Sequence, residues 1–302
     1  MPKICGILIT YNPDVEFFKL QINKLIRQLD YLIIVDNNSA SQYEIRNISS
    51  LASGSIIFQD LDDNYGLSAA QNIGVKIAVN LCATHIILFD QDSLIEDDFV
   101  RGLLEAETAL FSMGKKVAAV GPIFFDPVNN LFYPATVYVG PFLKRVFLNK
   151  KNPEVEATFV IASGCLIGMD ALNKIGLMNE GLFIDYIDVE WSLRARSFGF
   201  NVYITSRARM AHTVGESRVN ILGRTISIHS PLRRYYLIRN SFFMLRQSYI
   251  PFGYKLREVS FNILRFLIGF VFSKERKKYI YYAYWGVRDG IFGIFGSCKH
   301  RL

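Results

Sequence analysis

The chain is short of the features that mark membrane-spanning, zinc-knuckle and disulfide-rich proteins. Its four cysteines, at positions 5, 82, 165 and 298 of 302, lie far apart and form no Cys-x-x-Cys pair, which argues against a zinc knuckle or a redox pair. No uninterrupted apolar run approaches the roughly 18 to 20 residues that span a bilayer, although 51% of the residues are hydrophobic. We therefore expect reduced thiols, a sizeable core in one large or two small domains, and no membrane-spanning helix.

Signals for export and for two large classes of nucleotide-binding protein are also missing. The first apolar stretch, residues 4–9, is shorter than the roughly 7 to 15 residues of a signal-peptide core, so we expect a cytoplasmic protein. Neither Gly-x-x-x-x-Gly-Lys-Ser/Thr nor Gly-x-Gly-x-x-Gly occurs, which argues against P-loop NTPases and nicotinamide-dependent dehydrogenases.

Charged and aromatic residues are unevenly distributed. Residues 1–230 carry 20 basic and 24 acidic side chains, whereas residues 231–302 carry 14 and 3, together with 18 of the 42 aromatic residues. We place a domain boundary there, with a catalytic body before it and a basic, aromatic tail after it. This tail composition is typical of an interface with anionic lipid or nucleic acid.

Short β-rich runs alternate with segments of helical period over the first 125 residues, which predicts a doubly wound α/β sheet in parallel order. Residues 122–160, rich in Pro, Asn and aromatics, are expected to form loops and a short hairpin that help build a substrate pocket. The candidate strands are Ile4–Thr10, Tyr31–Asp36, Ser55–Gln59, His85–Asp90 and Val117–Gly121, with a later one at residues 201–205. Helices are expected at residues 15–29, 66–81, 97–113, 170–175 and 188–198.

Polar residues follow four of these strands at their carboxyl ends, where ligands bind in open α/β sheets. A carboxylate such as Asp36 can accept a hydrogen bond from the N–H of a pyrimidine base, and it is also typical of a helix cap or a turn. In Asp90-Gln91-Asp92, two carboxylates follow an apolar strand. That pattern suits Mg²⁺ or Mn²⁺ on a diphosphate, and it suits a solvated turn equally well.

Three further segments could carry chemistry. In residues 64–74, Gly66 stands at a loop-to-helix junction where backbone can approach a ligand. Residues 183–194 contain three acids and Trp191, which suit a general base beside a sugar-stacking ring or an acidic helix start with a buried indole. His212 is compatible with a structural role or with a manganese ligand.

Taken in order, these motifs resemble those of family 2 glycosyltransferases with the GT-A fold, which is Rossmann-like, and more narrowly those of bacterial rhamnosyltransferases. The resemblance covers residues 3–245 and implies that Asp36 recognises the base of a nucleotide-sugar. Residues 233–240, which begin with Arg233 and Arg234, resemble the Tyr-Tyr-x-x-Arg-Asn segment of rhamnosyltransferases, whose cations are expected to meet the pyrophosphate. The implied donor-binding residues are Thr10, Tyr11, Asn12, Asp36, Asn38, Asn64, Gly66, Asn72, Gln91 and Arg239.

The resemblance also implies a metal-dependent inverting transfer. Asp90 and Asp92 would hold Mg²⁺ or Mn²⁺ on the diphosphate, with His212 as a further metal or diphosphate contact. Asp188 aligns with the catalytic base, but Ile187 replaces the Glu of the usual Glu-Asp pair, which leaves Asp185 and Glu190 as substitutes for it. The implied acceptor-side residues are Gly164 and Trp191.

The expected reaction moves L-rhamnose from dTDP-rhamnose to a lipid-linked saccharide, in the synthesis of a bacterial surface polysaccharide such as O-antigen. A sugar-nucleotide-forming nucleotidyltransferase would instead need a Gly-rich, Arg/Lys-containing loop where this chain has Thr10-Tyr11-Asn12-Pro13. A nucleic-acid-binding module would leave Asp90, Asp92 and Asp188 without a role. For residues 250–302 we expect peripheral attachment to the inner face of the cell membrane, with a helical subdomain or an oligomer interface as alternatives.

Overall fold

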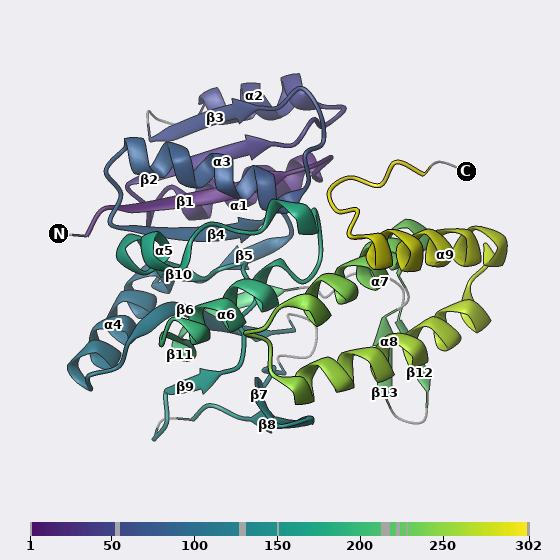
Figure 1. Cartoon of the computed structure of the whole chain (residues 1–302). Helices are drawn as coiled ribbons and strands as arrows, with labels where there is room; N and C mark the ends of the chain where they lie inside the picture. The colour runs from purple at the N-terminus through teal and green to yellow at the C-terminus, as the bar shows by residue number, and fades with distance from the viewer. Residues whose placement is uncertain are drawn as a thin grey trace.

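The computed structural model describes residues 2–51, 55–126, 131–149, 151–212, 218–221, 224–227 and 229–300. A nine-stranded sheet forms its centre, with strand order β3-β2-β1-β4-β10-β6-β11-β5 and with β9 paired to β11. Helices cover both faces of this sheet, and three further helices extend from one side of it (Figure 1). The α/β fold with C-terminal helices that the sequence predicts is therefore confirmed.

Four neighbouring strands of the sheet are parallel, as predicted. They are β1 (Ile4–Thr10), β2 (Tyr31–Asp36), β3 (Ile56–Asp60) and β4 (His85–Asp90). Their register places Thr10 opposite Asp36, Asp36 opposite Asp60, and Ile9 opposite Asp90. The polar residues that follow these strands therefore lie along one rim of the sheet.

The other half of the sheet is mixed, because it contains short antiparallel strands that the sequence did not predict. β10 (Leu166–Gly168) runs antiparallel between β4 and β6 (Val117–Phe125). β11 (Asn201–His212) is parallel to β6, whereas β5 (Ser93–Ile95) and β9 (Glu154–Ala157) pair with β11 in the antiparallel sense. Strands of three or four residues are too short to show a readable alternation, so periodicity could not reveal β5, β9 and β10 or their direction.

Separate apolar cores lie on the two faces of the sheet. Phe18, Ile45 and Leu103 belong to the core on one face, which is covered by α1 (Val15–Leu25), α2 (Gln42–Leu51) and α4 (Phe99–Ser112). The other face is covered by α3 (Leu67–Asn80), α5 (Met169–Ile175) and α6 (Ile187–Ser197). Gly74 lets α3 approach β1 closely, because a Cβ at that position would lie 2.3 Å from Ile7 Cγ2.

Two hairpins lie outside the main sheet. β7 (Ala135–Val139) pairs with β8 (Phe142–Val146), which confirms the short hairpin expected within residues 122–160. A hydrogen bond from Tyr138 N to Thr158 Oγ1 (2.7 Å) attaches this hairpin to the segment that follows β9. The second hairpin consists of β12 (Arg218–Ile221) and β13 (Arg224–Ser227).

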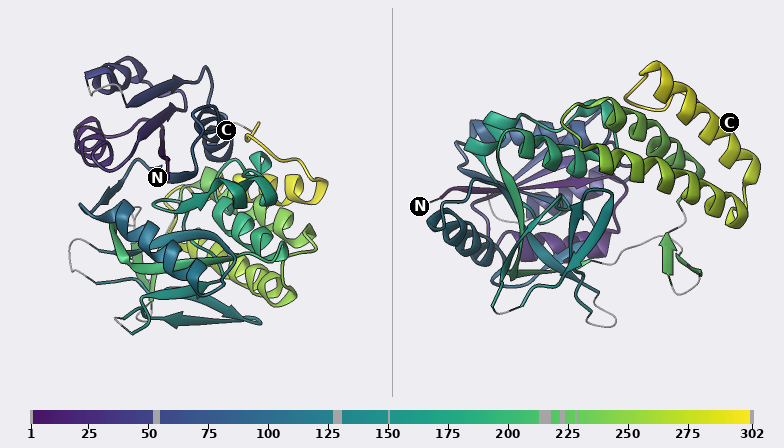
Figure 2. Two further views of the ribbon diagram at one scale, coloured as in Figure 1. Left: turned by 90° about the vertical axis from the view of Figure 1, so that its left-hand side faces the viewer. Right: turned by 60° about the horizontal axis from the view of Figure 1, so that its bottom comes forward.

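Three long helices form the C-terminal region and project from the α/β body (Figure 2). They are α7 (Pro231–Arg246), α8 (Phe252–Phe272) and α9 (Arg276–Phe292), and α9 packs along α7. α7 begins where the composition changes, with Ser230 Oγ accepting a bond from Arg233 N (3.3 Å) as its N-cap. Within the described ranges, no helix is both long enough and apolar enough to cross a bilayer.

Candidate active site

The loops that follow β1 and β4 are joined at the rim by the Gln91 side chain. Tyr11 donates its backbone N–H to Gln91 Oε1 (2.7 Å), and Gln91 Nε2 donates to the Tyr11 carbonyl (3.1 Å). Ser163 Oγ accepts a bond from the N–H of the neighbouring Asp90 (3.0 Å). The segment after β1 is thereby held against the Asp90-Gln91-Asp92 segment.

Asp36 lies at the centre of the β1/β2 side of the rim, by which we mean residues 10–12, 36–39 and 64–66. Its carboxylate is fully buried and accepts bonds from Thr10 Oγ1 (2.7 Å), Ser39 Oγ (2.6 Å) and Ser39 N (2.9 Å). Asn12 and Asn38 beside it adopt positive φ values of 49° and 67°, and Asn12 Oδ1 accepts a bond from Ala40 N (2.8 Å). This side is therefore ordered by internal hydrogen bonds, and base recognition by Asp36 stays a prediction.

The loop at Asn64–Gly66 connects this side of the rim to the segment that precedes α6. Asn64 Oδ1 accepts bonds from Asn37 Nδ2 (3.0 Å) and Gly66 N (3.0 Å). Gly66 has a φ of 88°, and a Cβ on it would lie 2.5 Å from Phe183 Cδ2. The predicted close approach at Gly66 is thus made by the protein's own Phe183, whose carbonyl also accepts a bond from Leu67 N (2.6 Å).

The structure brings three of the predicted carboxylates together, and we call Asp90, Asp92 and Asp188 the carboxylate cluster. The pKa of Asp90 is raised to about 7, mainly by burial and further by the negative charges of Asp92 and Asp188, while the charge of Arg233 opposes this rise. These groups come from β4, the loop after it, α6 and α7. The cluster therefore depends on tertiary packing rather than on one local motif.

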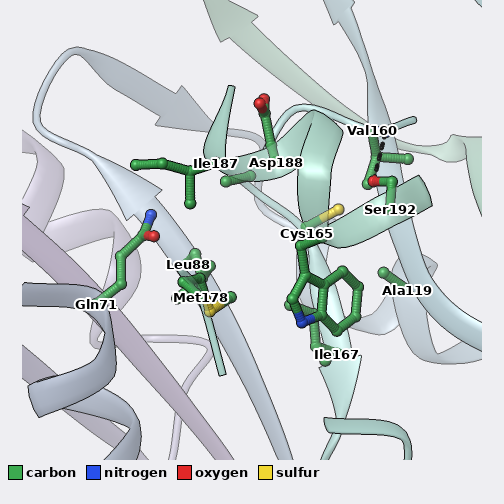
Figure 3. A pocket seen from close by; sticks show the side chains of 12 residues that line it. Gln71, Leu88, Ala119, Val160, Cys165, Ile167, Met178, Ile187, Asp188 and Ser192 are labelled. Carbon is green, nitrogen blue, oxygen red and sulfur yellow. Dashed lines mark hydrogen bonds between the residues drawn. The ribbon is translucent and has the colours of Figure 1, made fainter. Parts of the chain in front are cut away.

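Asp188 lies in the first turn of α6, at the edge of an apolar cavity lined by Leu88, Cys165, Met178 and Trp191. Figure 3 shows its carboxylate pointing away from these apolar side chains. The pKa of Asp188 is raised to about 6 by burial, against the opposing effect of bonds from backbone N–H groups, including that of Val189 (2.8 Å). A carboxylate with such a pKa is suited to accept a proton near neutral pH.

Asp185 and Glu190, the other two acids of this segment, are occupied by ion pairs. Arg233 Nη2 lies 3.0 Å from Asp185 Oδ1, and Arg194 Nε lies 2.9 Å from Glu190 Oε1. Glu190 is fully buried and also accepts a bond from the Tyr249 hydroxyl (2.5 Å). Both acids therefore have structural partners. Asp188 is the acid of this segment that belongs to the carboxylate cluster.

The segment before α6 adopts a strained backbone, which is common at functional sites. Phe183, Asp185 and Tyr186 all have positive φ values between 64° and 65°. Asn240 Nδ2, on α7, donates to the carbonyls of Leu182 (2.9 Å), Ile184 (2.8 Å) and Asp185 (3.2 Å). Asn240 thus holds the backbone that leads to Asp188, a role that its local sequence alone could not indicate.

Arg239 lies in the interior, away from the surface of the rim. It is fully buried, and its guanidinium donates to the carbonyls of Gly181 (3.1 Å), Leu182 (2.9 Å) and Gly296. Gly296 lies in the segment that follows α9. Its planar group also lies over the Tyr236 ring, 4.9 Å from the centroid. In this structure Arg239 supports the segment before α6, and its contact with pyrophosphate stays a prediction. Arg233, another cation of the 233–240 segment, lies beside the cluster.

Asn72 likewise makes internal contacts. Its Nδ2 donates to the Met178 carbonyl and to Glu180 Oε1 (both 2.9 Å), and its Oδ1 accepts from Met178 N (3.0 Å). These bonds attach α3 to the 3-10 turn η1 (Glu180–Leu182). A direct contact between Asn72 and a nucleotide-sugar stays a prediction.

The two predicted acceptor-side residues are packed in the core. Trp191 is buried and donates its Nε1–H to the Gly176 carbonyl (2.9 Å). Gly164 has a φ of 76°, and a Cβ there would lie 2.9 Å from Met210 Sδ. The backbone of His212 pairs with Ser93, next to Asp92. The side chain of His212, and with it the predicted metal contact, lies outside the described part of the chain.

The donor set fits a divalent cation bound by carboxylates and diphosphate oxygens. Asp90 and Asp92 supply oxygen ligands, which Mg²⁺ and Mn²⁺ prefer. Burial first, and then the negative charges of Asp92 and Asp188, raise the pKa of Asp90, and a bound cation would favour its ionised form. Among the described residues, no group of three or more His, Cys, Asp or Glu side chains could hold a metal by itself. A bound ion would therefore take its remaining ligands from water and a diphosphate, as Mg²⁺ usually does.

Comparison with known proteins agrees with this geometry. Residues 6–176 match the model of glycosyl transferase family 2. The chain is 30% identical to the dTDP-rhamnosyl transferase RfbF of Shigella flexneri over 300 residues, which cover 99% of both proteins.

Solved glycosyltransferase structures share the fold. The structure of GalNAc-T7 with UDP, GalNAc and Mn²⁺ superposes with a TM-score of 0.62 at 14% identity, covering 97% of this chain and 57% of that one. The mannosyltransferase PcManGT from Pyrobaculum calidifontis, in complex with GDP-Man and Mn²⁺, superposes with a TM-score of 0.57 at 12% identity, covering 97% and 88%. The GT-A fold is thereby confirmed, and the sequence matches show that the chain belongs to glycosyltransferase family 2.

Proposed function

We propose that this glycosyltransferase transfers L-rhamnose from dTDP-rhamnose to a lipid-linked saccharide, with inversion, in the synthesis of a bacterial surface polysaccharide such as O-antigen. The observation that carries the proposal is the convergence of Asp90, Asp92 and Asp188 at one rim of the sheet. Full-length identity of 30% to a dTDP-rhamnosyl transferase supports the choice of donor.

Asp188 is the proposed catalytic base. With a pKa of about 6, its carboxylate is mostly ionised at neutral pH and still basic enough to assist removal of the acceptor hydroxyl proton. The acceptor oxygen then attacks the anomeric carbon from the face opposite the nucleoside diphosphate, which leaves with the electron pair of the broken bond. One such displacement inverts the configuration and needs no covalent enzyme intermediate.

Asp90 and Asp92 are the proposed ligands of Mg²⁺ or Mn²⁺, with His212 as a further contact. A bound divalent cation would supply positive charge to the departing diphosphate. Arg233, whose charge lowers the pKa of Asp90, is the cation of this chain that we propose to assist.

The nucleotide is proposed to lie along the β1/β2 side of the rim, with Asp36 accepting the N3–H of the base. In this arrangement Asn72 and Arg239 act from the interior, because their side chains hold the η1 segment. Gly164 and Trp191 are likewise proposed to shape the acceptor side from positions inside the core. The other residues proposed to line the donor are Thr10, Tyr11, Asn12, Asn38, Asn64, Gly66 and Gln91.

A lipid-linked acceptor places the proposed reaction at the inner face of the cell membrane. The basic region of residues 250–302 is the proposed attachment to an anionic membrane surface, because its charge is opposite to that of anionic lipids.

A donor screen tests the proposal. Release of nucleoside diphosphate would be measured from dTDP-rhamnose, UDP-glucose and GDP-mannose, with a lipid extract of bacterial membranes as the acceptor source. We expect release from dTDP-rhamnose, abolished by a chelator and restored by Mn²⁺, and lost in Asp92→Ala and Asp188→Asn. Transfer that persists in the chelator would contradict the metal role, and a preference for another sugar nucleotide would contradict the donor.

A further inference from the structure

The outward face of α8 is apolar along its whole length. Of the nine exposed positions in this helix, eight carry apolar side chains and the ninth is Ser260. Because these positions recur at spacings of three and four, they form one continuous stripe on the helix. The eight side chains, between 39% and 79% exposed, are Phe252, Leu256, Val259, Ile263, Leu264, Leu267, Val271 and Phe272.

Two charged side chains of α8, those of Glu258 and Arg257, are directed to the inward face instead. Glu258 is buried and accepts a bond from the Tyr186 hydroxyl (2.6 Å). Arg257 Nη1 donates to the Tyr138 hydroxyl (2.7 Å), and its guanidinium lies 4.1 Å from the centroid of the Phe261 ring. This arrangement is the reverse of an ordinary surface helix, whose apolar stripe faces the core.

The tip of the β7–β8 hairpin extends the apolar stripe at its N-terminal end. Gly253 lies so close to the hairpin turn that a Cβ on it would be 2.6 Å from the Gly140 carbonyl carbon. Val139 and Phe142, on either side of this turn, are largely exposed, as is Phe252 beside it. We call the stripe and these two hairpin residues the α8 surface. A contiguous exposed apolar surface of this kind is typical of an interaction site.

Positive charge borders the α8 surface at both ends. Exposed Lys144 and Arg145 lie on β8. At the other end, the connection to α9 and the first turn of that helix present exposed Lys274, Arg276, Lys277 and Lys278, with Glu275 as the only acid among them. An apolar stripe flanked by cations is complementary to a layer of anionic lipid headgroups above acyl chains. A second copy of the chain would instead bring the same positive charge towards it.

We propose that the α8 surface, together with its two cationic borders, docks on the headgroup layer of an anionic lipid bilayer. The proposal rests on the proposed function for its biological purpose, because a lipid-linked acceptor lies at that layer. The proposal assigns the membrane contact to α8 and the tip of the β7–β8 hairpin. The basic residues Arg234 and Arg239 of α7 are not part of this contact, because they are buried inside the protein. Through Glu258 the same helix holds Tyr186, two residues before Asp188, so the docking helix is hydrogen-bonded to the segment that carries the proposed base.

Vesicle co-sedimentation of the full chain tests this. The probes are vesicles of phosphatidylcholine alone and of phosphatidylcholine with phosphatidylglycerol. We expect the triple variant Leu256→Asp/Ile263→Asp/Leu267→Asp to lose at least tenfold in affinity for the anionic vesicles. The matched control, Leu20→Asp/Val79→Asp/Phe111→Asp, adds the same charge at exposed apolar positions of the α/β body and should bind like the unmodified protein.

The charge of the cationic border is tested separately, with substitutions that leave the stripe intact. Replacement of Lys274, Arg276, Lys277 and Lys278 by Gln should abolish the preference for phosphatidylglycerol. Thermal unfolding checks that each variant is folded. A milder variant, Ile263→Ser/Leu267→Ser, should lose affinity in the same direction if the triple variant does not fold.

Three outcomes separate this proposal from others. Unchanged binding by a folded stripe variant would overturn it, as would a dimer in light scattering that the same substitutions dissociate. The variant Asp92→Ala should bind vesicles normally while losing transfer. If Asp92→Ala transfers sugar and the unmodified chain still binds vesicles, the proposed mechanism fails and the docking surface stands.

Discussion

The two sides of the rim differ in how their carboxylates are balanced. On the β1/β2 side, Asp36 is buried and accepts three hydrogen bonds from Thr10 and Ser39. In the carboxylate cluster, burial and the nearby like charges of Asp92 and Asp188 raise the pKa of Asp90 to about 7. The Asp36 carboxylate on the first side is satisfied by hydrogen bonds within the protein. The carboxylate cluster on the second side holds negative charge that a cation and substrate would balance. Of these two sides, unfavourable electrostatics is found on the one where chemistry is proposed, as is common at functional sites.

The largest effect is expected from removing the proposed base. Asp188→Asn preserves the shape of the side chain but cannot take up a proton at neutral pH, so kcat should fall by roughly 10² to 10⁴-fold. Steady-state kinetics with dTDP-rhamnose would measure it. Asp170→Asn, which alters an exposed acid on α5, is the matched control and should leave kcat unchanged. Full activity in Asp188→Asn would move the base elsewhere.

A smaller loss of activity is expected at Asn240, which touches no substrate in the proposal. Asn240→Ala removes three bonds to the strained segment before α6, so Asp188 should be held less firmly. We expect kcat to fall by about 10-fold to 100-fold with little change in the KM for donor, since misplacement of a catalytic group costs rate.

The control for Asn240 is Gln247→Ala, which removes one side-chain bond, to the Phe243 carbonyl, near the end of α7. It should leave kcat within about twofold, because surface changes away from such features have small effects. A loss in thermal stability with normal kcat in Asn240→Ala would show that Asn240 serves only the fold.

The pH dependence of kcat/KM should report the ionisation of Asp188, the proposed base. Because the ionised form of Asp188 is the active one and its pKa is about 6, kcat/KM should be level above this pH and fall about tenfold per pH unit below it. The profile should be measured with saturating Mn²⁺, so that Asp90 and Asp92 stay ionised as ligands. A flat profile between pH 5 and pH 8 would contradict the assignment.

The smallest expected effect is a change in thermal stability with pH, which should differ between the two sides of the rim. The pKa of Asp90 is raised above its ordinary value, so the folded state binds the proton more tightly than the unfolded chain does. The free energy of unfolding therefore falls as the pH rises from about 4 to about 7. Asp90→Asn removes this penalty, and its Tm should exceed that of the unmodified protein by about 2–4 °C at pH 8 and match it at pH 4.

Asp36→Asn is the counterpart on the β1/β2 side, and its effect should have the opposite sign. An amide there cannot accept all three bonds from Thr10 and Ser39, so unfolding at pH 8 should become easier by about 1–3 kcal/mol. Thermal melts of both variants at both pH values make the comparison. A lower Tm for Asp90→Asn at pH 8 would show that the cluster is not strained by like charges.

Much of the parallel half could be predicted from the sequence. β1, β2 and β4 begin and end at the predicted residues, because their apolar runs are four to six residues long and end in polar residues. α6 was predicted within a residue at each end for the same local reasons. The short strands of the mixed half were missed, because their pairing depends on β4, β6 and β11 and not on their own residues.

The tail shows the same division. Its composition predicted a basic and aromatic surface, but Arg234 and Arg239 are buried and form internal bonds. The apolar stripe lies on α8, and the exposed cations beside it, Lys274, Arg276, Lys277 and Lys278, lie on the connection to α9 and the first turn of that helix. A net charge per segment cannot separate cations that fold inward from cations that face solvent.

The sequence by itself determined the strand and helix pattern of the α/β body and the polar residues at each strand end, since periodicity and turn chemistry are properties of neighbouring residues. The tertiary structure alone decided that Asp90, Asp188 and Arg233 lie close together, that Arg239 and Asn240 hold the segment before α6, and that α8 turns its apolar side outward. These features join residues more than forty positions apart, and their electrostatics depends on burial, which exists only once the chain has folded.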